Sequence, residues 1–336
     1  MSTFVPGAEL SRRLYHEVVR PILSARFPGL PHAAALLGRG SEVLGFDDQM
    51  STDHDWKPRV LLFLAEEDEP RHGAEVREAL QRDLPESFAG HPTDYEVHTV
   101  RGYVQQQLEL DLDRDIEPRD WLTMPEQDLR KFTSGAVFHD EVGLQAARDR
   151  LAYYPRDVWL YLLITGWWRV HPEMNLVGRA GAAGDELGSA VIGSRLVSDL
   201  MRLAFLMERE YAPYSKWFGT AFSRLACGAE LTPVLSKVAR AEVWQDREAA
   251  LLPAYEKLIQ MHNDLALTEP VTAELVQLWD RPFKVAWDDI PDLLLPLIED
   301  PAVLRIARRW RVGPVDQLRG LMWPPGTRSL LVRLFE

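Results

Sequence analysis

The sequence predicts an α+β protein, with a mixed sheet near its N-terminus followed by an all-helical part. Three short apolar runs bounded by glycine, proline and polar turns have the length and setting of buried strands: 33–37, 55–65 and 93–100. Later in the chain the apolar residues recur at helical spacing instead. Strands and helices are therefore expected to form separate layers or domains.

Length and charge limit the function classes. The chain has 336 residues, enough for two moderate domains, and we expect these at 1–110 and 111–336. Its 38 basic and 51 acidic residues give a net charge of −13, so tight non-specific binding of nucleic acid is not expected.

Cysteine usage and hydropathy address the cellular location. The single cysteine, Cys227, cannot form an internal disulfide, which favours the cytoplasm. No apolar run reaches the ~18 to 20 residues that span a bilayer, so no membrane partner is expected. A thiolate zinc site is excluded for the same lack of cysteines, and no histidine pair stands at zinc-ligand spacing.

In the first hundred residues we expect a helix followed by strands. An amphipathic helix is expected over 9–26, with Pro21 inside it as a possible kink. The strand 33–37 then opens into a small loop, Gly38–Ser41. In the strand 93–100, Glu96 and His98 share one face because side chains alternate along a strand.

The remainder reads as helical. Helices are expected near 120–132, 141–151 and 184–209. The run 154–170 is apolar nearly all round and should form the central helix of the second half.

Two aspartates follow the glycine loop and suggest chemistry. Asp53 and Asp55 are spaced i and i+2, which would place both carboxylates on one face of a strand. Like charges held that close favour a cation between them, and Mg²⁺ binds one or two carboxylates together with substrate phosphates. The loop's glycines would let backbone N–H groups approach a polyphosphate. The pattern indicates phosphoryl or nucleotidyl transfer.

A family resemblance supports this interpretation. Gly40-Ser41, a short gap and Asp53-His54-Asp55 resemble the nucleotidyltransferase signature of the DNA polymerase β superfamily. The strings STDHDWKPRVLLFL, GDELGS and APYSKWFGTAF resemble the nucleotidyltransferase-like family DUF4037, over most of the chain from Ala33. The resemblance implies a polymerase-β-like catalytic domain and a helical domain that closes the cleft for nucleotide and acceptor.

The resemblance also implies roles for single residues. Asp53, Asp55 and Glu96 would bind Mg²⁺ (or Mn²⁺), with Glu96 standing where an aspartate is commoner. Gly40, Ser41 and Arg39 would hold the nucleotide phosphates.

Three residues of the second half are weaker candidates. Lys216 would contact the triphosphate and Tyr214 would stack near the base, although a lysine between aromatics is more often an exposed stem. Asp185 would act as general base, although an acidic residue that opens a helix is ordinary. Arg195 and Asp199 are expected to form a surface ion pair.

The function expected is transfer of a nucleoside monophosphate, AMP from ATP being favoured, to a hydroxyl of a small molecule or protein. An alternative is a nucleotide-sensing module without turnover. A third, transfer to tRNA or another RNA, would need a basic track, for which Arg305–Arg311 is the nearest candidate.

Overall fold

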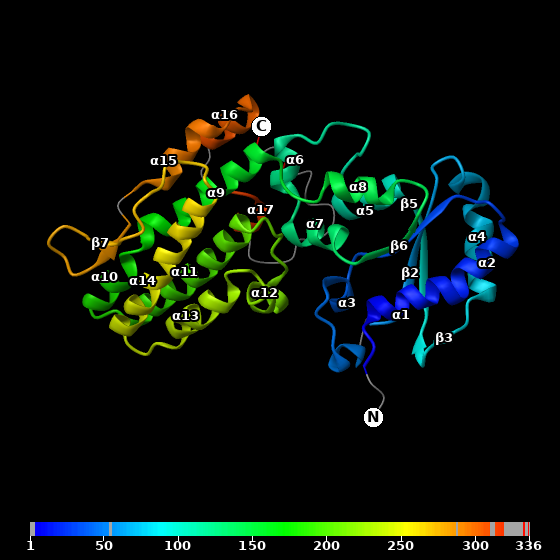
Figure 1. Ribbon diagram of the computed structural model, residues 1–336, viewed down its shortest axis with the longest axis horizontal. Coiled ribbons are helices and arrows are strands. Elements are labelled where there is room, and N and C mark those ends of the chain that lie inside the picture. Colours follow the sequence, from blue (N-terminus) through cyan, green and yellow to red (C-terminus); the bar gives the residue numbers. More distant parts are fainter. Residues whose placement is uncertain are drawn as a thin grey trace. The chain divides into compact units, whose positions relative to one another are not determined.

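The computed structural model describes residues 4–53, 56–286, 288–309 and 313–318, together with Val332 and Phe335. The chain forms two compact units, and Figure 1 shows the strands of the sheet in one and a bundle of helices in the other. The first unit contains residues up to 120 and 124–152; the second contains 121–123 and the chain from 153 to 318, within the described ranges.

The first unit alternates helices with strands. In chain order its elements are α1 (Gly7–Leu14), the π-helical turn η1 (Tyr15–Val19), α2 (Arg20–Arg26), β1 (His32–Leu36), α3 (Ser41–Leu44), the 3₁₀ turn η2 (Gln49–Asp53), β2 (Arg59–Leu64), α4 (Glu69–Asp83), β3 (Ser87–Phe88), β4 (His91–Pro92), β5 (Asp94–Thr99), α5 (Val100–Leu108), α6 (Pro118–Thr123, whose last residues belong to the second unit), α7 (Glu126–Thr133), β6 (Ala136–Asp140) and α8 (Leu144–Arg150).

The main sheet has the strand order β5-β2-β1-β6. β1 is antiparallel to both β2 and β6, whereas β2 is parallel to β5, with Leu61 opposite Glu96. A mixed α+β fold is thereby confirmed. β1 and β2 are buried along nearly their whole length, as expected for inner strands covered on both faces.

One face of the sheet packs on the helices that precede β1 and follow β2. Apolar side chains from α1, η1, α2, α4 and alternate positions of the strands form one core: Leu14, Tyr15, Val19, Leu23, Ala34, Val60, Leu62, Leu64, Val76, Leu80 and Val97. Because side chains alternate, Arg59, Leu61 and Phe63 lie on the opposite face of β2.

The N-terminal helix is one continuous run with a π-helical turn in its middle. Pro21 lies in the first turn of α2, directly after that turn. Proline has no N–H for the helical ladder, and the wider turn accommodates the break without ending the helix. The possible kink at Pro21 is therefore a local change of helix type.

Two predictions need correction. The second strand is expected to begin at Asp55, whereas β2 begins at Arg59 and Asp53 ends η2. A further strand, β6, precedes the helix expected from residue 141 and has no counterpart in the sequence-based expectations. β6 pairs with β1 and lies in the first unit.

The second unit is mainly helical. Its elements are α9 (Arg156–Val170), the 3₁₀ turn η3 (His171–Glu173), α10 (Leu176–Ala182), α11 (Glu186–Met207), α12 (Ser215–Phe222), α13 (Gly228–Arg240), α14 (Trp244–Asp264), β7 (Val276–Gln277), β8 (Lys284–Val285), α15 (Ile290–Leu294), the 3₁₀ turn η4 (Leu295–Leu297), α16 (Pro301–Arg309) and α17 (Val315–Leu318).

The central helix of this unit is α9, as predicted. Its residues are buried from Val158 to Trp167 without a break, and the indole N–H of Trp159 donates to the carbonyl of Leu206 at 2.7 Å. Within the described residues, no helix combines the length and apolar character that crossing a membrane requires.

The sheet core is expected to be sensitive to truncation. Leu62→Ala removes a side chain with 0 % exposure, and the cavity should lower the free energy of unfolding by about 2 to 5 kcal/mol. Urea unfolding measures this loss of free energy, and hydrogen exchange of the β2 amides reports it at the strand itself. Met50→Ala, at a position 79 % exposed, is the matched control and should change little; equal effects of both variants would contradict the core assignment.

Candidate functional site

The Gly38–Ser41 loop connects β1 to α3 and depends on its glycines. Gly38 has φ +88° and Gly40 has φ +120°, conformations that side chains disfavour. A Cβ on Gly38 would lie 2.9 Å from the hydroxyl of Tyr103, and a Cβ on Gly40 would overlap the carboxylate of Glu42. The loop therefore requires glycine at both positions.

Arg59, the first residue of β2, holds this loop from inside the protein. Its guanidinium pairs with the carboxylate of Glu42 and donates to the carbonyls of Arg39 and Leu37, the latter at 3.4 Å. The arginine side chain is 10 % exposed and the glutamate side chain is fully buried. β2 and α3 thus fix the loop between them.

The backbone N–H groups of the loop differ in whether they have a partner. The N–H of Gly38 is bound to the carbonyl of Lys131 at 3.0 Å. By contrast, the N–H groups of Arg39, Gly40 and Ser41 have no acceptor among the residues that the structure describes. Consecutive free N–H groups beside a positively charged side chain suit an anion with several oxygens, such as a phosphate.

A carboxylate and an imidazole lie on β5 beside the loop. Nε2 of His98 is 2.8 Å from Oε2 of Glu96, which confirms that the two residues share a face. This hydrogen bond lowers the pKa of Glu96 against the opposing effect of burial, and the charges of His98, Arg59 and Arg39 lower it further. Glu96 is thus an ionised, half-exposed carboxylate close to Arg39.

Tyr103 closes the cluster on its inner side. Its ring contacts His98 and Phe63 at centroid distances of 5.1 and 5.4 Å, and its hydroxyl lies under Gly38. Burial raises its pKa, so the group is a neutral hydroxyl. Sequence reasoning missed Arg59 and Tyr103; the available signal was Glu42 directly after Gly-Ser, with a lone arginine at the start of an apolar run.

The side chain of Asp53 and all of Asp55 lie outside the part of the chain that the structure describes. Their flanking residue Trp56 is buried, and its indole N–H donates to Oδ2 of Asp47 at 3.0 Å. The same Oδ2 accepts the N–H of Gly7 at 2.7 Å, and a Cβ on Gly7 would touch Glu42. The chain next to the aspartate pair is therefore anchored beside the residues that support the glycine loop.

The structure places the remaining candidates in the second unit. Asp185 is the N-cap of α11, where its Oδ1 accepts the N–H of Gly188 at 2.7 Å. Tyr214 is the N-cap residue of α12, and Nζ of Lys216 lies 4.9 Å from the centre of the Trp217 ring. Helix capping and cation–π packing account for Asp185 and Lys216 in structural terms.

The expected surface pair of Arg195 and Asp199 is wrong. Asp199 is buried and pairs with Arg169, whose Nε lies 2.9 Å from its Oδ1, while Arg195 pairs with Glu173. Both partners come from the neighbouring α9–η3 segment, because the packing of α11 against α9 offers cations and carboxylates closer than the next helical turn.

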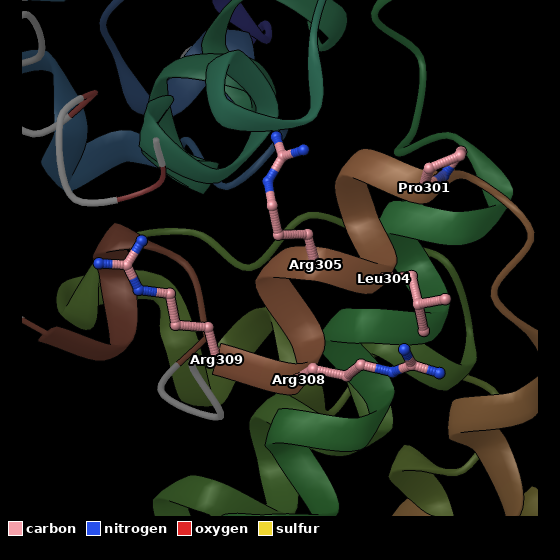
Figure 2. Close-up of a pocket in the computed structure, with 5 residues that line it drawn as sticks. All are labelled: Pro301, Leu304, Arg305, Arg308 and Arg309. Carbon is pink, nitrogen blue, oxygen red and sulfur yellow. The ribbon is translucent and has the colours of Figure 1, made fainter.

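The basic helix α16 borders an open hollow of ≈ 400 Å³ lined by Pro301, Leu304, Arg305, Arg308 and Arg309. Figure 2 shows the three guanidinium groups pointing in different directions from the helix. Such divergence does not create one point of high positive charge. The remainder of the expected Arg305–Arg311 stretch, residues 310 and 311, lies outside the described residues.

Comparisons with known proteins support the predicted family over part of the chain. Residues 121–218 match the family model described as a domain of unknown function, DUF4037. The matched segment contains the GDELGS string and most of APYSKWFG, and it does not include the glycine loop or the aspartate pair. No curated protein matches the chain.

One solved structure can be aligned over most of this chain. It is a nucleotidyltransferase-like protein from Exiguobacterium sibiricum 255-15, 10% identical, with 90% of this chain and 91% of that chain covered at a TM-score of 0.32. A likeness of this size establishes neither a shared fold nor a shared activity.

Removing Arg59 should destabilise the first unit strongly. Arg59→Met leaves the Glu42 carboxylate buried without its cation, and burial already raises the pKa of Glu42. We expect a loss of about 3 to 5 kcal/mol in the free energy of unfolding, measured in urea, and partial recovery in Arg59→Met/Glu42→Gln. Arg82→Met, which removes an exposed pair with Asp83, should cost less than about 1 kcal/mol. Similar losses in both arginine variants would contradict the supporting role.

The Glu96–His98 contact should make stability depend on pH. Because the folded-state pKa of Glu96 is lowered, its contribution is present above the ordinary value of 4.5 and is lost as the pH falls through the lowered pKa. The stability difference between wild type and Glu96→Gln should therefore exist at pH 7 and vanish in acid. Glu75→Gln, at an exposed position of α4, is the control. A difference between wild type and Glu96→Gln that persists unchanged at pH 2 to 3 would contradict this assignment.

Proposed function

We propose that this chain is a Mg²⁺-dependent nucleotidyltransferase that moves a nucleoside monophosphate, with AMP from ATP favoured, onto a hydroxyl of a small molecule or protein. The observation that supports it most is the glycine loop. Its conformation is fixed from inside by Arg59, and its N–H groups at Arg39, Gly40 and Ser41 are available next to the ionised Glu96.

The loop residues would bind the triphosphate. The three available N–H groups would donate to phosphate oxygens, and the exposed guanidinium of Arg39 would add charge-assisted hydrogen bonds. Because Arg59 already holds the carbonyls of Leu37 and Arg39, the donors need no rearrangement on binding, which favours pre-organised recognition.

The acidic residues would bind a magnesium ion. Glu96 offers an ionised, half-exposed carboxylate, and Asp53 and Asp55 would supply two more oxygen donors from the segment anchored at Trp56. Mg²⁺ prefers such carboxylates together with phosphate oxygens. When bound, it would neutralise phosphate charge and increase the acidity of an acceptor hydroxyl.

The proposed class of acceptor rests on the charge of the protein. A net charge of −13 disfavours long nucleic acids, and the guanidinium groups of α16 do not converge on one point. A hydroxyl on a small molecule or a protein meets no such repulsion. The same site would also serve a module that binds nucleotide without turnover, and release of pyrophosphate distinguishes the two.

Nucleotide binding should require both the metal and the aspartates. In calorimetric titrations with ATP, GTP, CTP and UTP, one nucleotide should bind with Mg²⁺ and not after its removal. Asp53→Asn/Asp55→Asn should weaken that binding by about tenfold or more, because two anionic oxygen donors are lost. Glu96→Gln should weaken it as well, while Glu75→Gln should bind as wild type. Unchanged Mg²⁺-dependent binding in the double variant would falsify the proposal.

A further inference from the structure

A second group of metal-ligating side chains lies at the other end of β1. His32, His139 and Glu141 each offer one ligand atom, and these atoms all lie within 4.8 Å of one another. The two imidazole rings have a centroid distance of 4.6 Å, and Nε2 of His139 is 3.0 Å from Oε2 of Glu141. In addition, the hydroxyl of Tyr15 lies 2.9 Å from Nε2 of His32.

The pairing of β1 with β6 creates this cluster. His139 is opposite Ala34, and the register shifts between Ala34 and Ala35, so that Phe138 is an extra residue in β6. A bulge of this kind redirects side chains, and here both Phe138 and His139 stack against the Tyr15 ring at 6.2 Å. The N–H of Glu141 then binds the carbonyl of His32 at 3.1 Å, which brings its carboxylate to the same place.

We propose that His32, His139 and Glu141 form a binding site for a divalent transition metal of the zinc class. Zinc is bound in some proteins by two imidazoles and one carboxylate, with the fourth coordination position left open. Nitrogen donors favour zinc over magnesium or calcium, which prefer oxygen. In a tetrahedral site the ligand atoms lie about 3.3 Å apart, so the present spacing needs only small side-chain rotations.

The surroundings of His32 prepare it as a ligand. Its Nδ1 is 3.1 Å from the carbonyl of Leu30, which places the N–H on that nitrogen and leaves the lone pair of Nε2, now 2.9 Å from the Tyr15 hydroxyl, as the donor to a metal. A metal bound at Nε2 would replace the Tyr15 hydroxyl as the partner of that nitrogen.

The site is separate from the glycine loop. His32 begins β1 and Leu36 ends it, two residues before Gly38, so the length of the strand, about 13 Å at ~3.3 Å per residue, lies between the two sites. A metal here would join β1, β6 and the turn into α8. It would therefore act on the stability of the first unit, and the proposal does not depend on nucleotidyl transfer.

The test is a zinc titration of the metal-free full-length chain by calorimetry, in a background of millimolar Mg²⁺. Wild type should bind one equivalent of Zn²⁺ at this site, and its melting temperature should rise with zinc. His139→Gln and Glu141→Gln should each weaken binding by about tenfold or more and abolish the thermal shift. Co²⁺ in place of zinc should give the visible absorption of a tetrahedral complex in wild type and not in His139→Gln.

Two controls make the result specific. His98 contacts Glu96 on the same sheet, and this contact does not include a second histidine. The variant His98→Gln should therefore keep full zinc affinity. Asp53→Asn/Asp55→Asn should also keep it, which excludes zinc binding at the proposed magnesium carboxylates. Circular dichroism of the metal-free variants verifies folding. Absence of zinc binding by folded wild type, equal binding by His139→Gln, or loss in either control would overturn the proposal.

Discussion

The first unit depends on the buried contact between Arg59 and Glu42. A cation inside a protein is stable only when its hydrogen bonds are satisfied, and Arg59 achieves this with one carboxylate and with the carbonyls of Leu37 and Arg39. The consequence is geometric: the carbonyls of Leu37 and Arg39 face inward to the arginine, and the N–H groups of Arg39, Gly40 and Ser41 have no acceptor among the described residues. The conformation of the proposed phosphate site thus depends on the buried guanidinium of Arg59, the first residue of β2.

β1 connects the two sites that we propose. It is an inner strand, antiparallel to both neighbours, and its sides are fully occupied by pairing. Its residues from Ala33 to Leu36 are buried, so the groups that we assign to function lie at its two ends. One end leads into Gly38–Ser41, where oxygen donors and N–H groups suit Mg²⁺ and a nucleotide; the other begins at His32, where nitrogen donors suit a softer metal.

The sequence predicted what depends on local pattern. β1 and β5 were located because they are short apolar or alternating runs, and the helix around Trp159 because it is apolar on all sides. β6 was missed because it is short, half-buried and next to a helix, so that its identity depends on pairing with β1. The His32–His139 cluster was invisible for the same reason, since its members are far apart in the chain. Arg59 was missed because periodicity identifies buried apolar residues and gives no signal for a buried charge.

The most direct test of the account is hydrogen exchange of the loop amides. In the free protein the N–H groups of Arg39, Gly40 and Ser41 have no described acceptor and should exchange fast. The account predicts that ATP with Mg²⁺ slows exchange in the peptide spanning residues 37–44, and that it does not do so in Asp53→Asn/Asp55→Asn. If ATP binds by calorimetry and this peptide exchanges as fast as before, the nucleotide lies elsewhere and the central claim is contradicted.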